Sequence, residues 1–295
     1  MKIGVALPTM AAGYTGPLLR EWCSMVDQGP YSSISTGERL TFVNPELIST
    51  LSACAALTER VDVLANIVVA GLHRPAMLAK QLATIDVLSE GRLVVGLGVG
   101  GRPHDYQAVD APFRSRHDTV DELAARLREL WAGVPPFEGA DPIGPACTQP
   151  GGPRLLSGAM GPKGLARAAR WADGITGFSV SGDPKEVALA ALGARQAWEA
   201  ASREEEPWLG TGTFCTLGVP DSLGVLQRFA ATYLGFLGTE MAEAVAQSLT
   251  VATPAELNRV LDGAEEVGIE EFTLVPGTWD PACLEAMTEV VEARV

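Results

Sequence analysis

An apolar strand followed by a helix recurs eight times along this chain of 295 residues. The strands are short runs rich in Val, Ile and Leu, a pattern typical of strands covered on both faces. Alternating units of this kind require parallel strands joined by right-handed crossovers. Eight such units match the usual length of a closed barrel, about 250 residues or more. The sequence therefore predicts an α/β fold, a single (β/α)8 TIM-barrel domain over residues 1–295. A doubly wound open sheet is disfavoured because no position marks a switch point.

The predicted strands cover residues 3–8, 31–36, 61–70, 93–98, 154–157, 175–180, 208–219 and 271–275. The predicted helices cover residues 17–26, 45–59, 75–91, 115–131, 163–172 and 184–202, two or three segments within 221–267, and 281–294. Residues 133–153 are rich in Gly and Pro and are predicted to form a loop. No charge run or serine-rich linker accompanies this loop, so it does not mark a domain boundary.

Charge and cysteine usage exclude several classes of partner. The net charge of −14 argues against nucleic acid or an anionic membrane as a partner. Five cysteines are scattered without C-x-x-C spacing, which indicates free, mostly buried thiols in a reducing compartment. No secretory signal pattern and no apolar run of membrane-spanning length is present, so we expect a cytoplasmic location. The three histidines lie too far apart to predict a metal site.

The fourth strand runs into a glycine-rich turn over residues 98–101. Gly96, Gly98 and Gly101 match the spacing G-x-G-x-x-G of dinucleotide-binding proteins. That fingerprint requires the glycines to open a helix directly, whereas the next helical pattern starts near Ser115. We therefore interpret the match as coincidence. The turn still lets the backbone approach a flat ring or an anion closely.

In a barrel of this type the chemistry lies in the loops after the strands. His104 and Asp105 follow the glycine turn and could act as acid and base, with plain surface placement as the alternative. Asn66 is a polar residue within an apolar strand, where it could also be a core asparagine bonded to backbone. His73 closes the loop before the third helix. The small residues 157–161 precede a helix and could form an anion cradle or an ordinary tight turn.

A long central block carries a family resemblance. It consists of Leu-His-Arg-Pro at 72–75, Leu-Ala-Lys-Gln-Leu-Ala-Thr-Ile-Asp at 78–86, and the segment 88–100. This block closely resembles the bacterial luciferase-like family, which comprises FMN-dependent monooxygenases and oxidoreductases that use the deazaflavin coenzyme F420. Phe113, Arg116 and Asp173-Gly174 also match recurring positions of the family. The resemblance covers residues 1–180 well and the remainder only as barrel units.

The resemblance implies a flavin or deazaflavin bound across the mouth of the barrel. Asn66-Ile67 would hold a non-proline cis bulge behind the ring. Gly98, Val99 and Gly100 would border the ring and its ribityl chain. The turn made of Ser157, Gly158, Ala159, Met160 and Gly161 would bind the phosphate through backbone N–H groups.

On the substrate side, Glu38 and Arg39 align with an acidic-histidine pair of the family. His73 and Phe178 are also predicted to contact substrate. The sequence departs from the family at three places: His73 and Arg74 stand in reversed order, Arg39 replaces a histidine, and Val99 replaces an arginine that luciferase has near the FMN phosphate. The last departure favours the deazaflavin branch.

The resulting hypothesis is an oxidoreductase that transfers a hydride from ring carbon five of reduced F420 to a small unsaturated or carbonyl substrate. Glu38, His104 or Asp105 would be the proton donor. The alternatives are an FMN-dependent monooxygenase served by a separate flavin or deazaflavin reductase, a catalytically silent flavin-binding barrel, and an unrelated barrel that binds a sugar phosphate at residues 158–161. Barrels of this family often dimerise, so a homodimer is expected.

Overall fold

Eight parallel strands pair in chain order and close into a barrel, with β8 beside β1. The computed structural model describes residues 1–294. The strands are β1 (Lys2–Ala6), β2 (Ser33–Thr36), β3 (Asp62–Val69), β4 (Leu93–Gly98), β5 (Arg154–Ser157), β6 (Gly174–Thr176), β7 (Trp208–Cys215) and β8 (Glu271–Pro276). This closure confirms the predicted (β/α)8 barrel.

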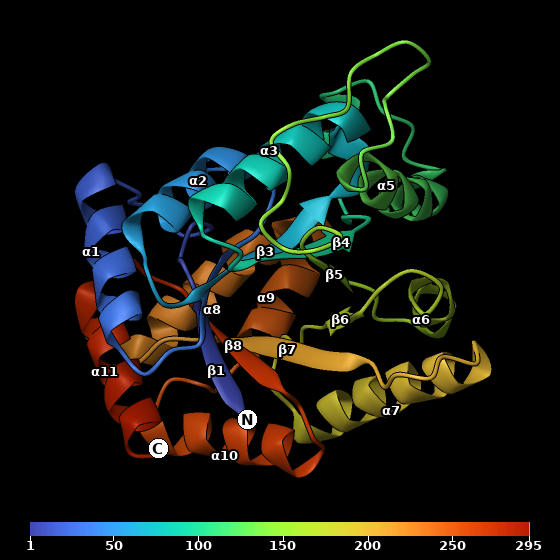
Figure 1. Cartoon of the computed structure of the whole chain (residues 1–295). Coiled ribbons are helices and arrows are strands. Elements are labelled where there is room, and N and C mark those ends of the chain that lie inside the picture. The colour runs from blue at the N-terminus through green and yellow to red at the C-terminus, as the bar shows by residue number, and fades with distance from the viewer. Residues whose placement is uncertain (295) are drawn as a thin grey trace.

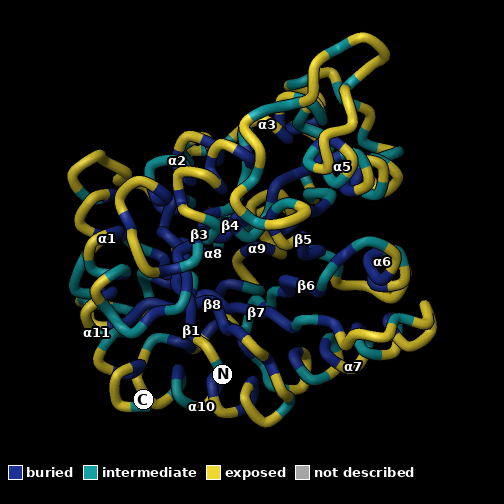
Figure 2. The backbone as a smooth tube through the Cα atoms, viewed as in Figure 1, coloured by how far each residue is buried: buried dark blue, intermediate teal, exposed yellow. Residues whose placement is uncertain are grey.

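A ring of helices surrounds the strands (Figure 1). The helices are α1 (Gly16–Gln28), α2 (Leu47–Leu57), α3 (Pro75–Leu88), α4 (Pro103–Gln107), α5 (Arg116–Trp131), α6 (Pro162–Ala168), α7 (Pro184–Ala200), α8 (Ser222–Leu234), α9 (Thr239–Gln247), α10 (Pro254–Glu266) and α11 (Pro281–Glu292), with 3-10 turns η1 (Ala70–Leu72) and η2 (Gly235–Leu237). The last helix packs beside the first and closes the ring. Figure 2 shows the strands buried and the outer helix faces exposed.

The predicted boundaries of β4 and β5 are confirmed, whereas other elements differ. The sixth strand is shorter than the predicted 175–180, although the N–H groups of Gly177 and Ser179 still donate to carbonyls of β7. The short helix α4 was not predicted, because five residues are too few to display an amphipathic period. Helix α3 ends at Leu88, before the predicted Gly91, which has the expected left-handed φ of 85°.

The Asp173-Gly174 pair proves to be structural. Asp173 accepts a hydrogen bond from the Leu155 N–H at 2.8 Å and two from Arg128 at 3.0 Å, so it joins β5 to α5. A Cβ at Gly174 would overlap the carbonyl oxygen of Trp208 on the neighbouring strand. The pair therefore allows β6 to lie close to its neighbours. All five cysteines are free, and four of them are buried, as predicted.

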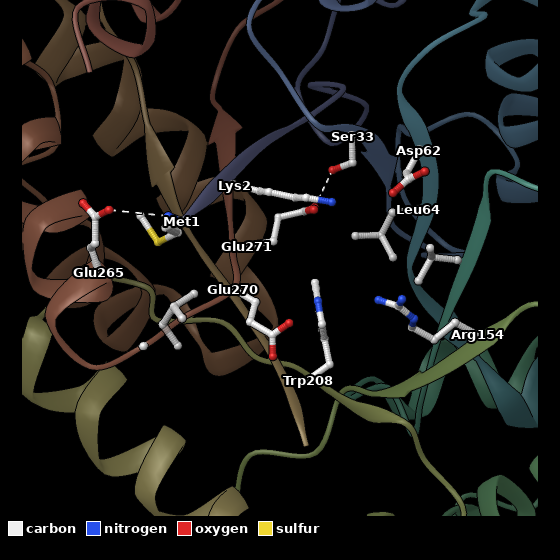
Figure 3. Close-up of a pocket in the computed structure, with 13 residues that line it drawn as sticks. Met1, Lys2, Ser33, Asp62, Leu64, Arg154, Trp208, Glu265, Glu270 and Glu271 are labelled. Carbon is white, nitrogen blue, oxygen red and sulfur yellow. Dashed lines mark hydrogen bonds and ion pairs between the residues drawn. The ribbon is translucent and has the colours of Figure 1, made fainter. Parts of the chain in front are cut away.

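The floor of the barrel contains a cavity of about 740 Å³ at the strand starts. Figure 3 shows Lys2, Asp62, Arg154 and Trp208 around it, with Glu271 beside Lys2. The Ser33 hydroxyl donates to Glu271 Oε1 at 2.6 Å. This cavity lies at the opposite end of the strands from the βα loops. The N-terminal face of such barrels serves stability rather than catalysis, so we do not place the active site here.

Burial raises the pKa of Glu271 above its ordinary value of 4.5, although the Ser33 hydroxyl opposes the shift. The folded protein thus holds the proton of the Glu271 carboxyl more tightly than the unfolded chain does. The wild type therefore loses stability as the pH rises above 4.5. We expect the stability of Glu271→Gln relative to wild type to increase as the pH rises above 4.5, where the carboxyl of the unfolded chain ionises. Urea denaturation at several pH values measures the difference. Glu270→Gln, at an exposed neighbouring position, is the control. A difference for Glu271→Gln that does not change with pH contradicts the assignment.

Candidate active site

Glu38 and His73 form a hydrogen-bonded pair at the mouth of the barrel. Nε2 of His73 lies 2.9 and 3.0 Å from the two carboxylate oxygens of Glu38. The backbone N–H of Val69 donates to the same carboxylate at 2.7 Å. The two side chains are only 14% and 10% exposed, so water competes weakly for the contact. The sequence analysis named both residues but did not predict their contact.

Local structure explains how the pair meets. Glu38 lies two residues after β2, and Val69 is the last residue of the neighbouring β3. The 3-10 turn η1 then reverses the chain, and His73 is its C-cap residue. Pro75 opens α3, because its ring fits the first helical turn and its missing N–H is not needed there. The family motif around His73 therefore holds an imidazole over the end of β2.

The peptide bond between Asn66 and Ile67 is cis, as the resemblance implies. The pairing of β3 with β4 shifts register between Ala65 and Val68, which marks a bulge at this bond. The Thr176 hydroxyl, from the end of β6, donates to Asn66 Oδ1 at 3.0 Å. Asn66 is thus bonded to a side chain across the barrel, rather than to neighbouring backbone.

The glycines of β4 make room for the side chain of Ile67. A Cβ at Gly98 would overlap Ile67 Cδ1, and one at Gly96 would lie 3.1 Å from Ile67 Cγ2. Gly158, after β5, has the same neighbour at 3.0 Å. These glycines thus let Ile67 cross the mouth, so the first surface they border is a protein side chain. Their contact with a cofactor ring stays a prediction.

A cavity of about 650 Å³ opens between the ends of β4 and β5 and helices α5 and α6. Its lining includes the predicted cofactor residues Gly98, Val99, Ser157, Gly158, Ala159, Met160 and Gly161. The structure therefore brings the predicted ring-binding turn and the predicted phosphate-binding turn to one cavity. Gly100 follows this lining with a left-handed φ of 60°.

The phosphate-binding turn offers fewer free N–H groups than predicted. The Gly158 N–H donates to the Leu97 carbonyl at 2.8 Å, and the Ala159 N–H donates to Ser157 Oγ at 3.2 Å. The N–H groups of Met160 and Gly161 have no acceptor within residues 1–294. The groups that could bind an anion here are therefore the N–H groups of Met160 and Gly161, together with Lys163, which lines the same cavity.

His104 and Asp105 do not form an acid–base pair in this structure. His104 is exposed on α4. Asp105 is 4% exposed, and its Oδ1 accepts the N–H and the hydroxyl of Thr41 at 2.8 and 2.5 Å. The contacts of Asp105 tie the loop after β2 to α4. The catalytic role of His104 and Asp105 stays a prediction. The geometry favours Glu38 as the acidic group of the site.

An aromatic wall adjoins the mouth on the side of β6 and β7. The rings of Phe178 and Phe214 pack edge to face with centroids 4.7 Å apart, and Phe214 also contacts Phe229 and Tyr233 of α8. Phe178 was predicted to contact substrate, whereas the other rings were missed. Phe229 and Tyr233 are four residues apart on a helix and share a face, so this spacing was the available signal.

Neither a metal-binding cluster nor a membrane-spanning helix is found within residues 1–294. No group of three or more His, Cys, Asp or Glu side chains is arranged to hold a metal ion. No helix in the same part of the chain is both long and apolar enough to cross a membrane.

The family model for luciferase-like monooxygenases matches residues 1–295. The chain belongs to the luciferase-like monooxygenase family. The resemblance predicted from the central block is thereby confirmed.

Curated relatives of this luciferase-like chain match over less than half of it. It is 32% identical over 133 residues to an F420-dependent hydroxymycolic acid dehydrogenase of Mycobacterium tuberculosis, covering 42% of this chain and 37% of that protein. It is 31% identical over 140 residues to the pyrimidine monooxygenase RutA of Escherichia coli, covering 44% of this chain and 38% of that protein. The match thus spans less than two fifths of each relative.

Solved structures resemble the chain over its full length. Monooxygenase RslO1 from Streptomyces bottropensis has a TM-score of 0.80 and 22% identity, covering 100% of this chain and 99% of that one. The oxygenating constituent of 3,6-diketocamphane monooxygenase from Pseudomonas putida, in complex with FMN, has a TM-score of 0.73 and 14% identity, covering 99% and 96%. At these identities the likeness shows the fold alone.

Proposed function

We propose that this protein is an oxidoreductase that binds the deazaflavin coenzyme F420 at the barrel mouth and reduces a small organic substrate. The observation that carries the proposal is the Glu38–His73 pair, which sits beside the cis bulge at Asn66-Ile67. Reduced F420, when bound, supplies a hydride, and the chain must then supply a proton to the substrate. A partly buried carboxylate–imidazole pair is suited to that task.

In the Glu38–His73 pair, Glu38 orients the imidazole and His73 faces the substrate. Glu38 accepts hydrogen bonds from Val69 N–H and from Nε2–H of His73, which fixes the orientation of the imidazole. Nδ1 of His73 has no partner within residues 1–294. A proton shared between Glu38 and His73 can therefore reach a substrate at the mouth. This geometry also supplies the imidazole whose loss was the reason to consider a silent barrel.

The cavity at β4 and β5 fits the phosphate-bearing part of such a cofactor. Its turn carries two unpaired N–H groups, at Met160 and Gly161, and its rim carries Lys163. The nearby Arg167 is already held by ion pairs with Asp118 and Asp121, so Lys163 is the side chain that would attract a phosphate in this cavity. Ile67, next to the cavity, would support one face of the ring.

FMN is the second candidate cofactor. RutA is a monooxygenase by name, so the match to RutA supports the oxygen-inserting alternative. The match to the F420-dependent dehydrogenase supports F420 as the cofactor. Val99, at a place where luciferase has an arginine near the FMN phosphate, favours F420. If FMN binds, the same mouth would serve an oxygen-inserting reaction, and a separate reductase would supply reduced flavin.

Titration of the protein with each cofactor, followed by absorbance and calorimetry, tests the choice. Saturable binding of F420 without binding of FMN supports the proposal. Binding of FMN alone supports the monooxygenase alternative, and binding of neither overturns the assignment of the site.

We expect Gly161→Asp to weaken cofactor binding by tenfold or more, because it places a carboxylate beside the N–H groups that would hold the phosphate. A Cβ at Gly161 meets no atom within 4 Å, and the residue is the N-cap of α6. Asp and Asn are both favourable at that position, so the fold should persist. Gly161→Asn, of equal size and uncharged, is the matched control and should bind within about threefold of wild type. Equal affinities of both variants would refute the phosphate assignment.

A further inference from the structure

Two arginines from separate loops meet at the end of helix α8. Nη1 of Arg39, after β2, donates to the carbonyl oxygen of Tyr233 at 3.3 Å. Nη2 of Arg102, after β4, donates to the same oxygen at 3.5 Å. Helix α8 follows β7, which neighbours neither strand. The end of α8 and the two guanidinium groups therefore lie across the barrel mouth.

Aromatic rings hold the flat faces of both guanidinium groups. Arg39 lies 3.6 Å from the ring centre of Phe42, and Arg102 lies 4.3 Å from that of Phe236. Tyr233 faces both, at 5.5 and 5.0 Å. Stacking of this kind uses the faces of the cations and leaves their N–H edges free for other partners.

The two cations have more donors than the structure has acceptors. Each guanidinium carries five N–H donors, and a single carbonyl oxygen serves both. The Nε atoms of Arg39 and Arg102 are buried and have no hydrogen-bond partner within residues 1–294. None of the ion pairs within residues 1–294 involves either guanidinium group. The acidic group whose charge acts on Arg39 is Asp105, whose carboxylate is hydrogen-bonded to Thr41.

A purely structural role explains one of these arginines but not two. One cation suffices to cap the carbonyl end of a helix. A second adds like-charge repulsion: burial, and then the charge of Arg102, lower the pKa of Arg39 to about 10. An anion bound between the two guanidinium groups would offset this repulsion.

We propose that Arg39 and Arg102 bind the carboxylate of an organic acid, and that the substrate of this enzyme is such an acid. This inference rests on the proposed function, because it places the substrate at the mouth. Arg39 directly follows Glu38, so a carboxylate on the arginines holds the rest of the molecule near the Glu38–His73 pair. Guanidinium groups recognise carboxylates through paired N–H···O bonds, which fixes orientation as well as charge. The phosphate-binding cavity at β5 is a separate place.

Calorimetric titration of the full chain with benzoate, and with benzamide as its uncharged analogue, tests the proposal without cofactor or turnover. Benzoate is expected to bind wild type at least tenfold more tightly than benzamide. Arg102→Gln should weaken benzoate binding about tenfold or more and leave benzamide unchanged. Arg74→Gln, an exposed arginine in the loop after β3, removes the same charge and should stay within about twofold of wild type. Thermal unfolding of each variant checks that the fold persists.

Three results overturn the proposal: no preference of wild type for benzoate, equal losses in Arg102→Gln and Arg74→Gln, or weakened binding of F420 or FMN in Arg102→Gln with benzoate unaffected. The last result assigns the arginines to the cofactor. Failure of wild type to bind either cofactor, with benzoate binding intact, instead overturns the proposed function.

Discussion

Glu38→Gln is expected to lower the rate at which reduced F420 is oxidised by substrate by about two to four orders of magnitude, the usual contribution of a positioned acid or base. The amide keeps the size of the side chain and can still accept the Val69 N–H. It cannot share a proton with Nε2 of His73, which lies 2.9 Å from Glu38 in the wild type. Cofactor affinity should stay within about threefold, because Glu38 does not line the cavity at β4 and β5.

His73→Gln should reduce the rate by a similar factor, and the double variant should lose little more than either single one, because the two residues act as a unit. His104→Gln is the control. This histidine is exposed, and its replacement should leave the rate unchanged. A large loss in His104→Gln with full activity in Glu38→Gln would transfer the acid–base role to α4. The rate is followed by absorbance with the substrate found by screening carbonyl compounds and organic acids.

Arg92→Met is expected to lower the free energy of unfolding by about 3 kcal/mol, one of the largest single-residue effects on stability. Arg92 belongs to the family block Ser-Glu-Gly-Arg-Leu between α3 and β4. Its guanidinium donates to the carbonyls of Ala55, Thr58 and Val61, which end α2 and precede β3. Methionine fills a similar space but leaves these carbonyls without a donor.

Urea denaturation measures this loss. Arg92→Lys keeps the charge but cannot reproduce the forked geometry, so it should lie between wild type and Arg92→Met. Arg170→Met, at an exposed position, is the surface control and should stay within about 0.5 kcal/mol of wild type. Equal stability of Arg92→Met and Arg170→Met would show that the guanidinium contacts contribute nothing net.

Periodicity was informative where a segment is long enough to display it. The eight strand–helix units, and the limits of β4 and β5, follow from local hydrophobic runs because both faces of each strand are buried. Helix α4 was not predicted, because its five residues do not complete two helical turns. The cis bond at Asn66-Ile67 came from family resemblance alone, since nothing in the local residues distinguishes it from a trans bond.

In the candidate site, the sequence identified individual residues but not their contact partners. Glu38, His73, Arg39 and the turn at 157–161 were all named from the sequence, because the ends of barrel strands locate functional loops. Their partners were not. His73 contacts a residue 35 positions away, and Arg39 and Arg102 reach a carbonyl 194 and 131 positions away. Contacts at such separations depend on how the barrel closes and on the direction of each loop side chain, and no local pattern records either.

By itself, then, the sequence determined the barrel, the end of it that carries the chemistry and the family to which the chain belongs. These follow from local burial periods and from a long contiguous motif. Only the tertiary structure decided that Glu38 pairs with His73, that the glycines of β4 accommodate Ile67, and that two arginines share one carbonyl oxygen. Each of these depends on the side chains that barrel closure brings within a few ångströms of one another.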